Sequence, residues 1–514
     1  DFAGRFVFDA NEDVNKALAA RGALLNAAPY AHSYPYCWRC KQPIIFRSTW
    51  QWFISMEASD LRRKALAAID RVRWIPDWGR DRIYNMILNR PDWCISRQRA
   101  WGVPIPVFYC KDCGELLLSG EVAEHVAKIF EKEGSDAWFA REAKDLLPPG
   151  TVCQACGKTA IEKEADIVDV WFDSGVSYAA VCEHDPKLGV PVDMYLEGSD
   201  QHRGWFHSTL LAAVGTRGDA PYKSVLTHGF VVDGEGKKMS KSLGNTIAPQ
   251  EIIDKYGAEV LRLWVSAQDY KNDIRISNEI IDRLVETYRK IRNTVRFMLG
   301  NLSDFDPAKD ALPYGEMLEL DRYALHVMQD LIEKVVGAYK DFEPYVIYQQ
   351  VHNFCVVDMS SFYLDILKDR LYVYRKDSRE RKSAQTALFK IIQDLTRLMA
   401  PILSFTAEEI WDHLPAYAGK ESSVHISAMP VKNEALRDEA LAATWQRFRE
   451  LRQEVSKVME QARRDKVIGH PLDALVRLTA KGETLAFLNQ VKPFLREVLI
   501  VSAVEVGQGE GPYI

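Results

Sequence analysis

Residues 193–245 read "DMYLEGSDQHRGWFHSTLLAAVGTRGDAPYKSVLTHGFVVDGEGKKMSKSLGN" and alternate between extended and helical patterns. The apolar runs 193–198 and 224–232 have the composition of strands, and residues 202–216 between them have the composition of a helix. Strand, helix and strand at this spacing predict a parallel α/β unit, and a further strand-like run, "DIVDVWF" (166–172), precedes it. Because ligands bind at the carboxyl ends of strands in such sheets, the predicted site comprises the residues that follow these runs: Asp173, residues 197–201 and His228.

The loop after the last run is positively charged and flexible. Lys238 and Lys241 lie three residues apart, and glycines surround them. Lysine is a point charge that suits phosphate, and a mobile lysine can follow charge that moves during phosphoryl chemistry. The loop is not a Walker loop, because the sequence has no G-x-x-x-x-G-K-[ST]. The residues alone leave two interpretations open, a phosphate clamp and an exposed basic hairpin that binds nothing.

The turn after the first run is rich in polar groups. Glu197, Asp200, Gln201 and His202 supply carboxylate, amide and imidazole groups, and Trp205 follows them. A small polar ligand with an apolar tail needs this combination. The alternative is a plain strand-to-helix turn in which Asp200 caps the helix.

Six of the nine cysteines form three Cys-x-x-Cys pairs. Two pairs, Cys110 with Cys113 and Cys153 with Cys156, are each followed by glycine and together predict a structural Zn²⁺ site, with free or redox thiols as the alternative. The third pair, Cys37 and Cys40, has no partner pair in this chain. Either it binds nothing or its partners lie upstream of residue 1.

Beyond about residue 248 the pattern is helical. Between residues 325 and 339 apolar residues repeat at helical spacing. In "SFTAEEIWDHL" (404–414), Thr406 and Glu409 predict a capping box. The helix predicted at 445–466 carries a face of basic residues, which is either solvated or in contact with nucleic acid: Arg447, Arg449, Arg452, Arg463, Arg464 and Lys466.

Length and composition limit the classes of protein. A chain of 514 residues is too long for one core, and its net charge of −6 argues against a protein that is basic throughout. No apolar run approaches the roughly 18–20 residues of a membrane span, and no signal peptide is visible, so we expect a cytoplasmic protein without membrane contact. The sequence begins without Met and as if within a domain, which predicts a fragment.

The wording around the lysine loop resembles one enzyme family. "KKMSKS", with "HGFVVDGEG" before it and "LGNTIAP" after it, resembles the signature loop of class I aminoacyl-tRNA synthetases. Further segments occur in the same order in isoleucyl-tRNA synthetases, and the resemblance covers nearly the whole chain: "YPYCWRCKQPIIFRSTWQWFISM" (34–56), "RPDWCISRQRAWGVPIP" (90–106), "DVWFDSG" (169–175) and "DMYLEGSDQHRGWF" (193–206). The valine and leucine enzymes, whose wording differs around "SRQ" and the cysteine pairs, are the alternative.

The resemblance implies an α/β part followed by an all-α part. The family's catalytic domain is a Rossmann-like, doubly wound parallel sheet, split by a large editing insertion and followed by a helical anticodon-binding bundle. This chain would hold part of that sheet. The implied ranges are 1–40 for the tail of the editing insertion, 41–245 for the second half of the catalytic domain, with a zinc-knuckle insert at about 107–165 and the KMSKS loop at 238–242, then 246–314 for a connecting region, 315–470 for the bundle and 471–514 for a C-terminal junction.

The resemblance also implies roles for individual residues. Lys238 and Lys241 would hold the phosphates of ATP. Glu197 would lie against the aminoacyl adenylate, and Gly198, Asp200 and Gln201 would line the nucleotide site. His228 would approach the adenine, and Trp101 and Trp205 would wall the isoleucine side chain.

The implied activity is ATP-dependent activation of L-isoleucine and its transfer to tRNA(Ile), by a monomer with ATP and Mg²⁺ as substrate and Zn²⁺ as structural metal. The chain departs from the family pattern because it contains no His-x-Gly-His and lacks the core of the editing domain. We therefore expect this polypeptide alone not to catalyse adenylation at a useful rate. A non-catalytic tRNA-binding module is the alternative from another functional class.

Overall fold

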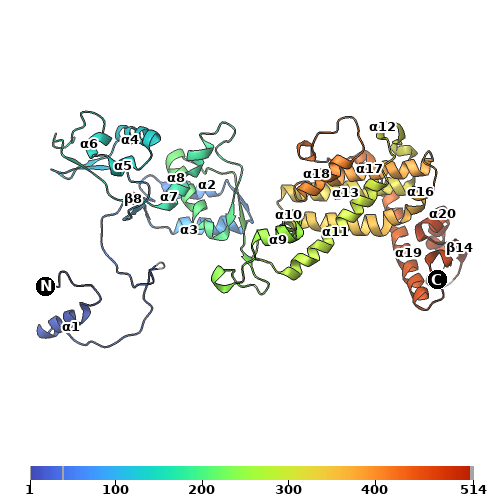
Figure 1. Ribbon diagram of the computed structural model, residues 1–514, viewed down its shortest axis with the longest axis horizontal. Coiled ribbons are helices and arrows are strands. Elements are labelled where there is room, and N and C mark those ends of the chain that lie inside the picture. Colours follow the sequence, from blue (N-terminus) through green and yellow to red (C-terminus); the bar gives the residue numbers. More distant parts are fainter. Residues whose placement is uncertain (1, 38–39, 510–514) are drawn as a thin grey trace. The chain divides into compact units, whose positions relative to one another are not determined.

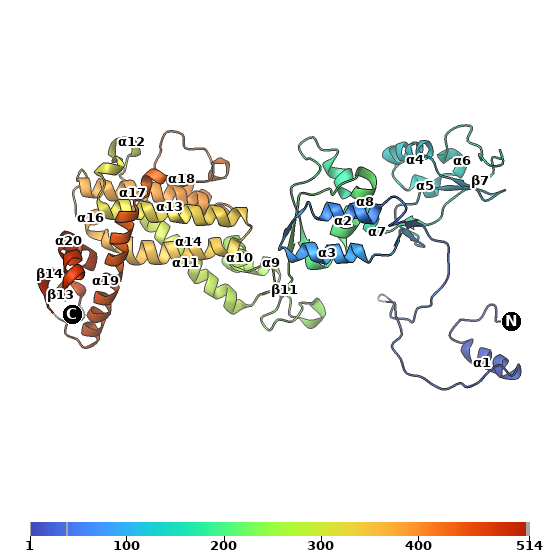
Figure 2. The ribbon, with the colours of Figure 1, turned by 180° about the vertical axis from the view of Figure 1, so that it is seen from behind.

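The computed structural model describes residues 2–37 and 40–509 (Figures 1 and 2). Residues 1 and 38–39 of the predicted range 1–40, and residues 510–514 of the predicted range 471–514, lie outside the described residues. The chain divides into two compact units, one formed by residues 1–64 and 88–177, the other by residues 65–87 and 178–514. Within the described residues, none of the helices combines the length and the apolar character that crossing a membrane requires.

A three-stranded parallel sheet forms the start of the second unit. Its order is β2 (Arg73–Ile75), β10 (Ser224–His228) and β9 (Tyr195–Gly198), with β10 parallel to both neighbours. The helix α8 (Trp205–Arg217) connects β9 to β10, which confirms the predicted strand–helix–strand unit. β10 is the central strand and its first four residues are buried, which explains its unbroken apolar pattern.

The prediction of a strand at 166–172 is wrong for most of that run. Only β8 (Ile167–Val168) is extended, and it pairs antiparallel with β4 (Ser96–Arg97), outside the parallel sheet. The buried carboxylate of Asp169 accepts a hydrogen bond from the Trp171 N–H and so caps α7 (Val170–Gly175). Asp173 therefore lies in a helix of the first unit and does not follow a strand of the parallel sheet.

The first unit contains the predicted cysteine-rich insert. Its sheet has the order β6–β5–β7, all antiparallel, and packs with α4 around a core that includes Phe108 and Trp138. The other elements of this unit are short apart from α1. The bounds are α1 (Asn11–Ala20), β1 (Phe53–Ile54), β3 (Trp93–Cys94), β5 (Phe108–Cys110), β6 (Leu116–Leu117), α4 (Gly120–Glu133), α5 (Ala137–Ala140), α6 (Ala143–Leu146) and β7 (Ile161–Lys163). The boundaries between the units pass through α2 (Leu61–Ile69) and α3 (Trp78–Leu88).

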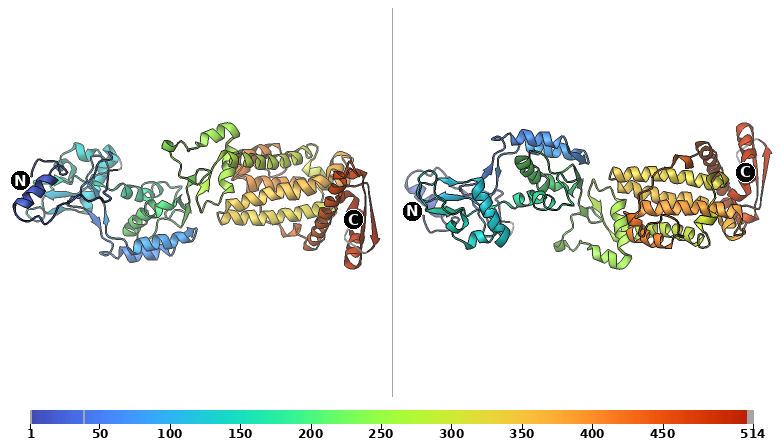
Figure 3. Two further views of the ribbon diagram at one scale, coloured as in Figure 1. Left: turned by 90° about the horizontal axis from the view of Figure 1, so that it is seen from below. Right: turned by 90° about the horizontal axis from the view of Figure 1, so that it is seen from above.

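Helices dominate the second unit after the sheet, as predicted, and α11, α13 and α17 lie side by side in it (Figures 1 and 3). Between the sheet and the helices, β11 (Val231–Val232) pairs in parallel with β12 (Ile274–Arg275). The helices are α9 (Pro249–Tyr256), α10 (Ala258–Ala267), α11 (Asn278–Gly300), α12 (Pro307–Asp310), α13 (Glu319–Lys340), α14 (Pro344–Asn353), α15 (Leu364–Ile366), α16 (Lys368–Tyr372), α17 (Arg379–Met399), α18 (Ser404–His413) and α19 (Glu439–Arg464). A π-helical segment, Phe354–Tyr363, joins α14 to α15. The chain continues with the parallel pair β13 (Leu475–Ala480) and β14 (Ala503–Gln508), connected by α20 (Gly482–Leu499).

The helical periodicity at 325–339 falls on α13, where Leu325, Met328 and Val335 are buried. The predicted capping box at Thr406 and Glu409 is wrong, because α18 begins at Ser404. The first-turn N–H groups of Phe405 and Thr406 point to the carboxylate of Glu259 in α10, which takes the place of a local cap.

Candidate functional site

The carboxyl ends of β9 and β10 bring two of the predicted site residues together. His228 is the register partner of Gly198, and the Nε2 atom of His228 lies 3.7 Å from Oε1 of Glu197. Glu197 Oε1 also accepts a hydrogen bond of 2.9 Å from the Gly198 N–H. The Nδ1 atom of His228 lies 2.7 Å from the carbonyl oxygen of Gly229, so it carries the proton and Nε2 is the acceptor in the neutral ring. Both side chains are partly exposed, and this edge therefore offers a carboxylate and an imidazole to a ligand.

Gly198 leaves the room in which a ligand can approach this edge. A Cβ atom there would lie 2.9 Å from Oδ1 of Asp200 and 3.4 Å from the ring of Phe230. A larger residue would displace the Asp200 carboxylate. Phe230 was not among the predicted site residues, since an exposed aromatic after a strand gives no distinct pattern in the sequence.

Gln201, and not Asp200, holds the start of α8. The Trp205 N–H donates to Gln201 Oε1 at 2.8 Å, and Gln201 Nε2 donates to Oδ2 of Asp200 at 3.0 Å. Asp200 therefore contacts the cap residue Gln201 and not the first N–H group of α8. These hydrogen bonds contradict the alternative in which Asp200 caps the helix.

His202 belongs to the core rather than to the ligand edge. Its side chain is fully buried, with Nδ1 at 3.1 Å from the Ser199 carbonyl oxygen, and rings of Trp74, Trp78 and Phe206 surround it. Burial lowers the pKa of His202, which keeps the ring neutral. Its grouping with the ligand-facing residues in the sequence was therefore wrong, because polar residues at successive positions of a turn cannot all face the same side.

The two predicted tryptophans have different surroundings. Trp205 stacks on Tyr195 of β9 with ring centroids 4.0 Å apart and an angle of 15°. Trp101 is 92% exposed and belongs to the other unit. That both line one amino-acid pocket stays a prediction.

Asn245 and Asp233, which were not among the predicted site residues, hold the lysine loop in place. Asn245 accepts a hydrogen bond from the Ser240 N–H at 2.9 Å, and its Nδ2 donates to Asp233 at 2.9 Å and to the Lys238 carbonyl at 3.3 Å. Residues Lys241–Leu243 form a 3-10 turn that ends at Gly244 with φ +66°, a left-handed conformation that favours glycine. The loop is thus an ordered turn and not a loose hairpin.

This arrangement leaves the two lysines available. Among the described residues neither Lys238 nor Lys241 forms an ion pair, whereas Lys237 Nζ lies 2.7 Å from Glu235. Met239 between them packs against the core of the helical part. The side chain of Ser242, the last residue of the predicted KMSKS loop, lies outside the described residues. Two ammonium groups on an ordered turn can bind a polyanion such as the phosphates of a nucleotide.

Comparisons with known proteins identify the family. The family model described as "tRNA synthetases class I (I, L, M and V)" matches residues 9–277, and the one described as "Anticodon-binding domain of tRNA ligase" matches residues 321–478. The chain belongs to the class I tRNA synthetases. The resemblance and the fold class predicted from the sequence, α/β followed by a helical anticodon-binding part, are confirmed.

Relatives and solved structures agree with this assignment. The isoleucine–tRNA ligases of Geobacter sulfurreducens and Syntrophotalea carbinolica are each 59% identical, over 100% and 98% of this chain and 55% and 54% of their own lengths. The synthetase chain thus spans about half the length of these curated relatives. Methionyl-tRNA synthetase of Mycobacterium tuberculosis, bound by methionyl-adenylate, has a TM-score of 0.55 at 16% identity, over 78% of this chain and 70% of its own, which supports the fold alone.

Four cysteines of this synthetase form a group that could hold a metal ion. Their sulfur atoms lie within 4.8 Å of one another, with 3.6 Å between Cys110 and Cys156 and 3.6 Å between Cys113 and Cys153. Zn–S bonds of about 2.3 Å place the sulfurs of a tetrahedral site about 3.8 Å apart, so the group fits such an ion. The N–H groups of Cys113 and Asp112 lower the pKa of Cys110 to about 7, whereas the neighbouring thiols and burial raise the pKa of Cys113 to about 12 against the hydrogen bond from the Glu115 N–H.

Both cysteine pairs have the same backbone turn. The N–H of Gly114 donates to the Cys110 carbonyl and the N–H of Gly157 to the Cys153 carbonyl, at 2.9 and 2.8 Å. Both glycines have a positive φ, +74° and +72°, a conformation that favours glycine. The turn directs both thiols of each pair to one point.

The pair Cys37 and Cys40 repeats this turn. The Cys37 N–H donates to the Gln42 carbonyl at 2.8 Å and the Lys41 N–H donates to the Cys37 carbonyl at 2.9 Å. Lys41 has φ +57° at the position that glycine occupies in the other two pairs. Within the described residues, however, the one cluster of three or more possible ligands is the four-cysteine group. Metal binding by Cys37 and Cys40 with upstream partners stays a prediction.

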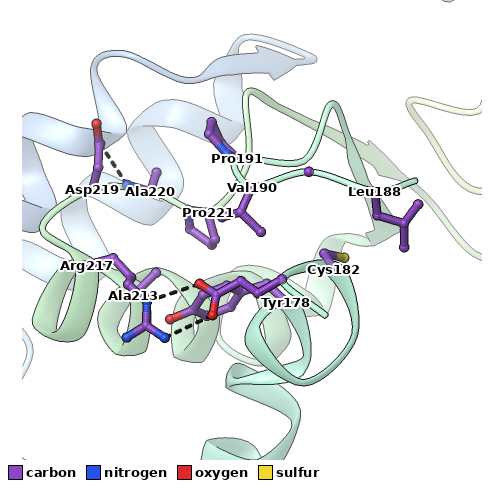
Figure 4. Close-up of a pocket in the computed structure, with 12 residues that line it drawn as sticks. Tyr178, Cys182, Leu188, Val190, Pro191, Ala213, Arg217, Asp219, Ala220 and Pro221 are labelled. Atoms are coloured by element: carbon purple, nitrogen blue, oxygen red, sulfur yellow. Dashed lines mark hydrogen bonds and ion pairs between the residues drawn. The ribbon is translucent and has the colours of Figure 1, made fainter. Parts of the chain in front are cut away.

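A cavity of about 480 Å³ lies elsewhere on this synthetase (Figure 4). Residues 188–191 and 219–221 line it, and they precede β9 and β10, so the cavity lies at the amino ends of these strands. Arg217 on its wall makes two hydrogen bonds to Glu183, of 3.1 and 3.0 Å, and is thereby satisfied. We assign the cavity no part in the site at the carboxyl ends.

Proposed function

We propose that the chain is part of an isoleucine–tRNA ligase, which activates L-isoleucine with ATP and Mg²⁺ and transfers it to tRNA(Ile). The observation that carries the proposal is the edge formed by Glu197, Gly198 and His228, together with the loop after β11. Among the described residues, Lys238 and Lys241 of this loop form no ion pair. Eight isoleucine–tRNA ligases that are 52–59% identical to this chain support the choice of amino acid. A valyl- or leucyl-tRNA synthetase and a non-catalytic tRNA-binding module are the alternatives.

The chemistry asks mainly for positioning and charge. The carboxylate of the amino acid attacks the α-phosphorus of ATP in line, forms the acyl–phosphate bond and expels pyrophosphate. Lys238 and Lys241 would neutralise the charge that builds up on the leaving pyrophosphate. His228 would approach the adenine, Glu197 would lie against the aminoacyl adenylate, and Gly198, Asp200 and Gln201 would line the nucleotide site. Transfer of the aminoacyl group to the terminal ribose of tRNA follows.

The remaining parts would support this reaction. Trp101 and Trp205 would wall the isoleucine side chain. Zn²⁺ on Cys110, Cys113, Cys153 and Cys156 would hold the insert together and take no part in the chemistry. We retain the predicted division into the ranges given above, and a monomeric state, as parts of the proposal.

Selective binding of aminoacyl-sulfamoyl adenosines tests the function. We expect the chain to bind the isoleucyl compound about 10–200-fold more tightly than the valyl compound in calorimetric titrations, because one methylene is worth about 1–3 kcal/mol. The leucyl compound should bind no better than the valyl one. Preference for the valyl or leucyl compound would transfer the assignment to that enzyme, and binding of tRNA without any of the three would favour the non-catalytic module.

Titration with ATP and Mg²⁺ adds a second arm to this test. Lys241→Ala should weaken ATP binding about tenfold, because a hydrogen bond to a charged group is worth about 1.5–3 kcal/mol. Lys237→Ala is the matched control, since Lys237 is already paired with Glu235. Equal effects of the two substitutions would contradict the role of Lys241.

We do not place the tRNA contact on the basic face predicted on α19. Arg449 lies 2.6 Å from Asp358, Arg452 lies 2.6 Å from Asp365, and the guanidinium of Arg447 lies over the ring of Phe487. Arg463 and Arg464 both pair with Glu460. These arginines mainly hold α19 to its neighbours or to its own acidic residue.

The second half of α11 offers a better surface. Residues 287–300 include four cations and no acidic residue. Arg289 pairs with Glu286 and Arg292 with Glu409, whereas Arg296 forms no ion pair among the described residues. Asn293 and Arg296 line two neighbouring hollows of about 360 and 430 Å³, and Phe297 and Tyr372 belong to the second. Tyr372 is 64% exposed, and Arg375 and Lys376 follow it. Exposed aromatics for stacking on bases, interleaved with cations for phosphates, are the chemistry of single-stranded RNA binding.

The double variant Arg296→Glu, Tyr372→Ala should lower the affinity for tRNA(Ile) about 100-fold, because it removes a stacking platform worth about 1–3 kcal/mol and reverses one charge. Filter binding at several salt concentrations measures this, together with a shallower salt dependence. The matched control is Arg463→Glu, Arg464→Glu on α19. A larger loss in the control than in the double variant would return the RNA contact to α19.

A further inference from the structure

One residue, Tyr270, connects the ligand edge of the parallel sheet to the end of α13. Its backbone carbonyl accepts a hydrogen bond of 2.8 Å from the N–H of Gly229, the residue after His228. Its hydroxyl donates a hydrogen bond of 2.7 Å to the carbonyl of Phe342, the second residue after α13. Tyr270 thus holds the sheet side with its backbone and the helical side with its side chain.

The contact on the sheet side is unusually close. A Cβ atom at Gly229 would lie 2.3 Å from the backbone of Asn272 and 2.6 Å from the nitrogen of Asp273. The Phe230 N–H also donates to Oδ1 of Asp273 at 2.8 Å. Backbones packed this closely, without a side chain between them, must move together.

On the helical side, Phe342 is in a conformation that aromatic residues avoid. Its φ is +55°, and the Glu343 N–H donates to the Ala338 carbonyl at 2.8 Å, which is the helix ending that usually takes glycine. The phenylalanine has two contacts there. Its carbonyl accepts from Tyr270, and its ring lies 5.6 Å from the guanidinium of Arg73, the first residue of β2. A strained residue held by contacts on both sides is the kind of position at which function is found.

We propose that Tyr270 is a positioning residue that couples the binding of tRNA by the helical part to the geometry of the Glu197–His228 edge. The coupling rests on the proposed function, whereas the mechanical connection does not. A displacement at the end of α13 reaches Gly229 through the hydroxyl and carbonyl of Tyr270, beside the ion pair of 3.3 Å between Lys271 and Glu343. His228 precedes Gly229 in the chain. By thermodynamic reciprocity, an adenylate on the edge changes the affinity for tRNA by the same factor as tRNA changes the affinity for the adenylate.

The variant Tyr270→Phe removes only the hydroxyl. The matched control is Tyr345→Phe, because Tyr345 lies in the first turn of α14 and its hydroxyl donates to Glu343 at 3.4 Å, on the helical side of the connection. Hydrogen exchange should become about tenfold faster at the amides of Gly229 and Phe230 in Tyr270→Phe, which corresponds to the loss of one hydrogen bond, and stay unchanged in the control and in the core of α17. If exchange in Tyr270→Phe became faster by the same factor throughout the chain, Tyr270 would be a purely structural residue.

The second readout is the affinity for isoleucyl-sulfamoyl adenosine with and without saturating tRNA(Ile). We expect tRNA to change it at least about fivefold in the unsubstituted chain and in Tyr345→Phe, and by less than half of that factor in Tyr270→Phe. If both ligands bind without affecting each other, or if Tyr270→Phe keeps the full effect, the coupling is overturned while the proposed function stands. If neither ligand binds, the proposed function fails, and the exchange at Gly229 still decides whether Tyr270 makes the connection.

Discussion

Replacement of Cys153 by serine should abolish metal binding and unfold the insert at about 107–165. Cys153 is buried in the core of the insert and lies 3.6 Å from Cys113, so that its loss removes one of four ligands and leaves a polar hydroxyl in an apolar core. The apparent free energy of zinc binding to structural sites is about 10–16 kcal/mol at neutral pH, which exceeds what this small core can supply. Elemental analysis should find one zinc per chain before the substitution and none after it.

Hydrogen exchange over the insert gives the structural readout. The amides of β5 and β7 should lose their protection in Cys153→Ser, and a chelator should have the same effect on the unsubstituted chain. Cys182→Ser is the control, since Cys182 is half-buried and lies outside the four-cysteine group. One bound zinc and full protection in Cys153→Ser would rule out the metal site.

The second large effect is expected from Asp321→Ala, within the helical part. Asp321 is fully buried and accepts hydrogen bonds from the Tyr363 hydroxyl at 2.7 Å and from Arg370 at 3.3 Å. Arg370, itself only 4% exposed, also donates to Glu497 of α20 at 2.6 Å. Removing one partner of a buried ion pair costs about 3–5 kcal/mol, because the other charge stays buried.

Denaturation by urea should show this loss in the free energy of unfolding of the helical part. The control is Asp377→Ala, which removes an exposed partner of Arg375 and should leave the midpoint almost unchanged. The double variant Asp321→Ala, Arg370→Met should recover part of the stability, since it no longer buries a guanidinium that has lost one of its two carboxylate partners. A single variant as stable as the control would show that the buried pair contributes little.

The sequence predicted those parts of the fold in which neighbours along the chain determine the structure. The unit β9–α8–β10 was predicted because each element has its own apolar pattern and the connection is direct. The run at 166–172 was misassigned because Asp169, a helix cap, looks in the sequence like a polar residue inside an alternating strand. β2 was missed because a strand of three residues is too short to show an alternation of apolar and polar residues in the sequence. β10 nevertheless pairs with all three residues.

Contacts between distant residues explain the other differences. The N–H groups at the start of α18 need Glu259, which lies almost 150 residues away and which no local rule could select. The cysteine pairs were predicted because their chemistry is specific at short spacing. A sequence does not show which arginines are paired, and so it could not show that Arg449 and Arg452 of α19 are held by Asp358 and Asp365.

The way in which the insert is closed at its base has a consequence for engineering. β5 and β7 pair with each other, and each cysteine turn lies beside this pair, so that the strands and the four thiols fasten the two ends of the insert at the same place. The entropy of closing a loop grows only slowly with its length, by about 0.6 kcal/mol for each doubling. Residues added at the exposed turn around Gly134 or Gly150 should therefore be accepted with little loss of stability. Either turn is a natural place for a fluorescent label or a small tag.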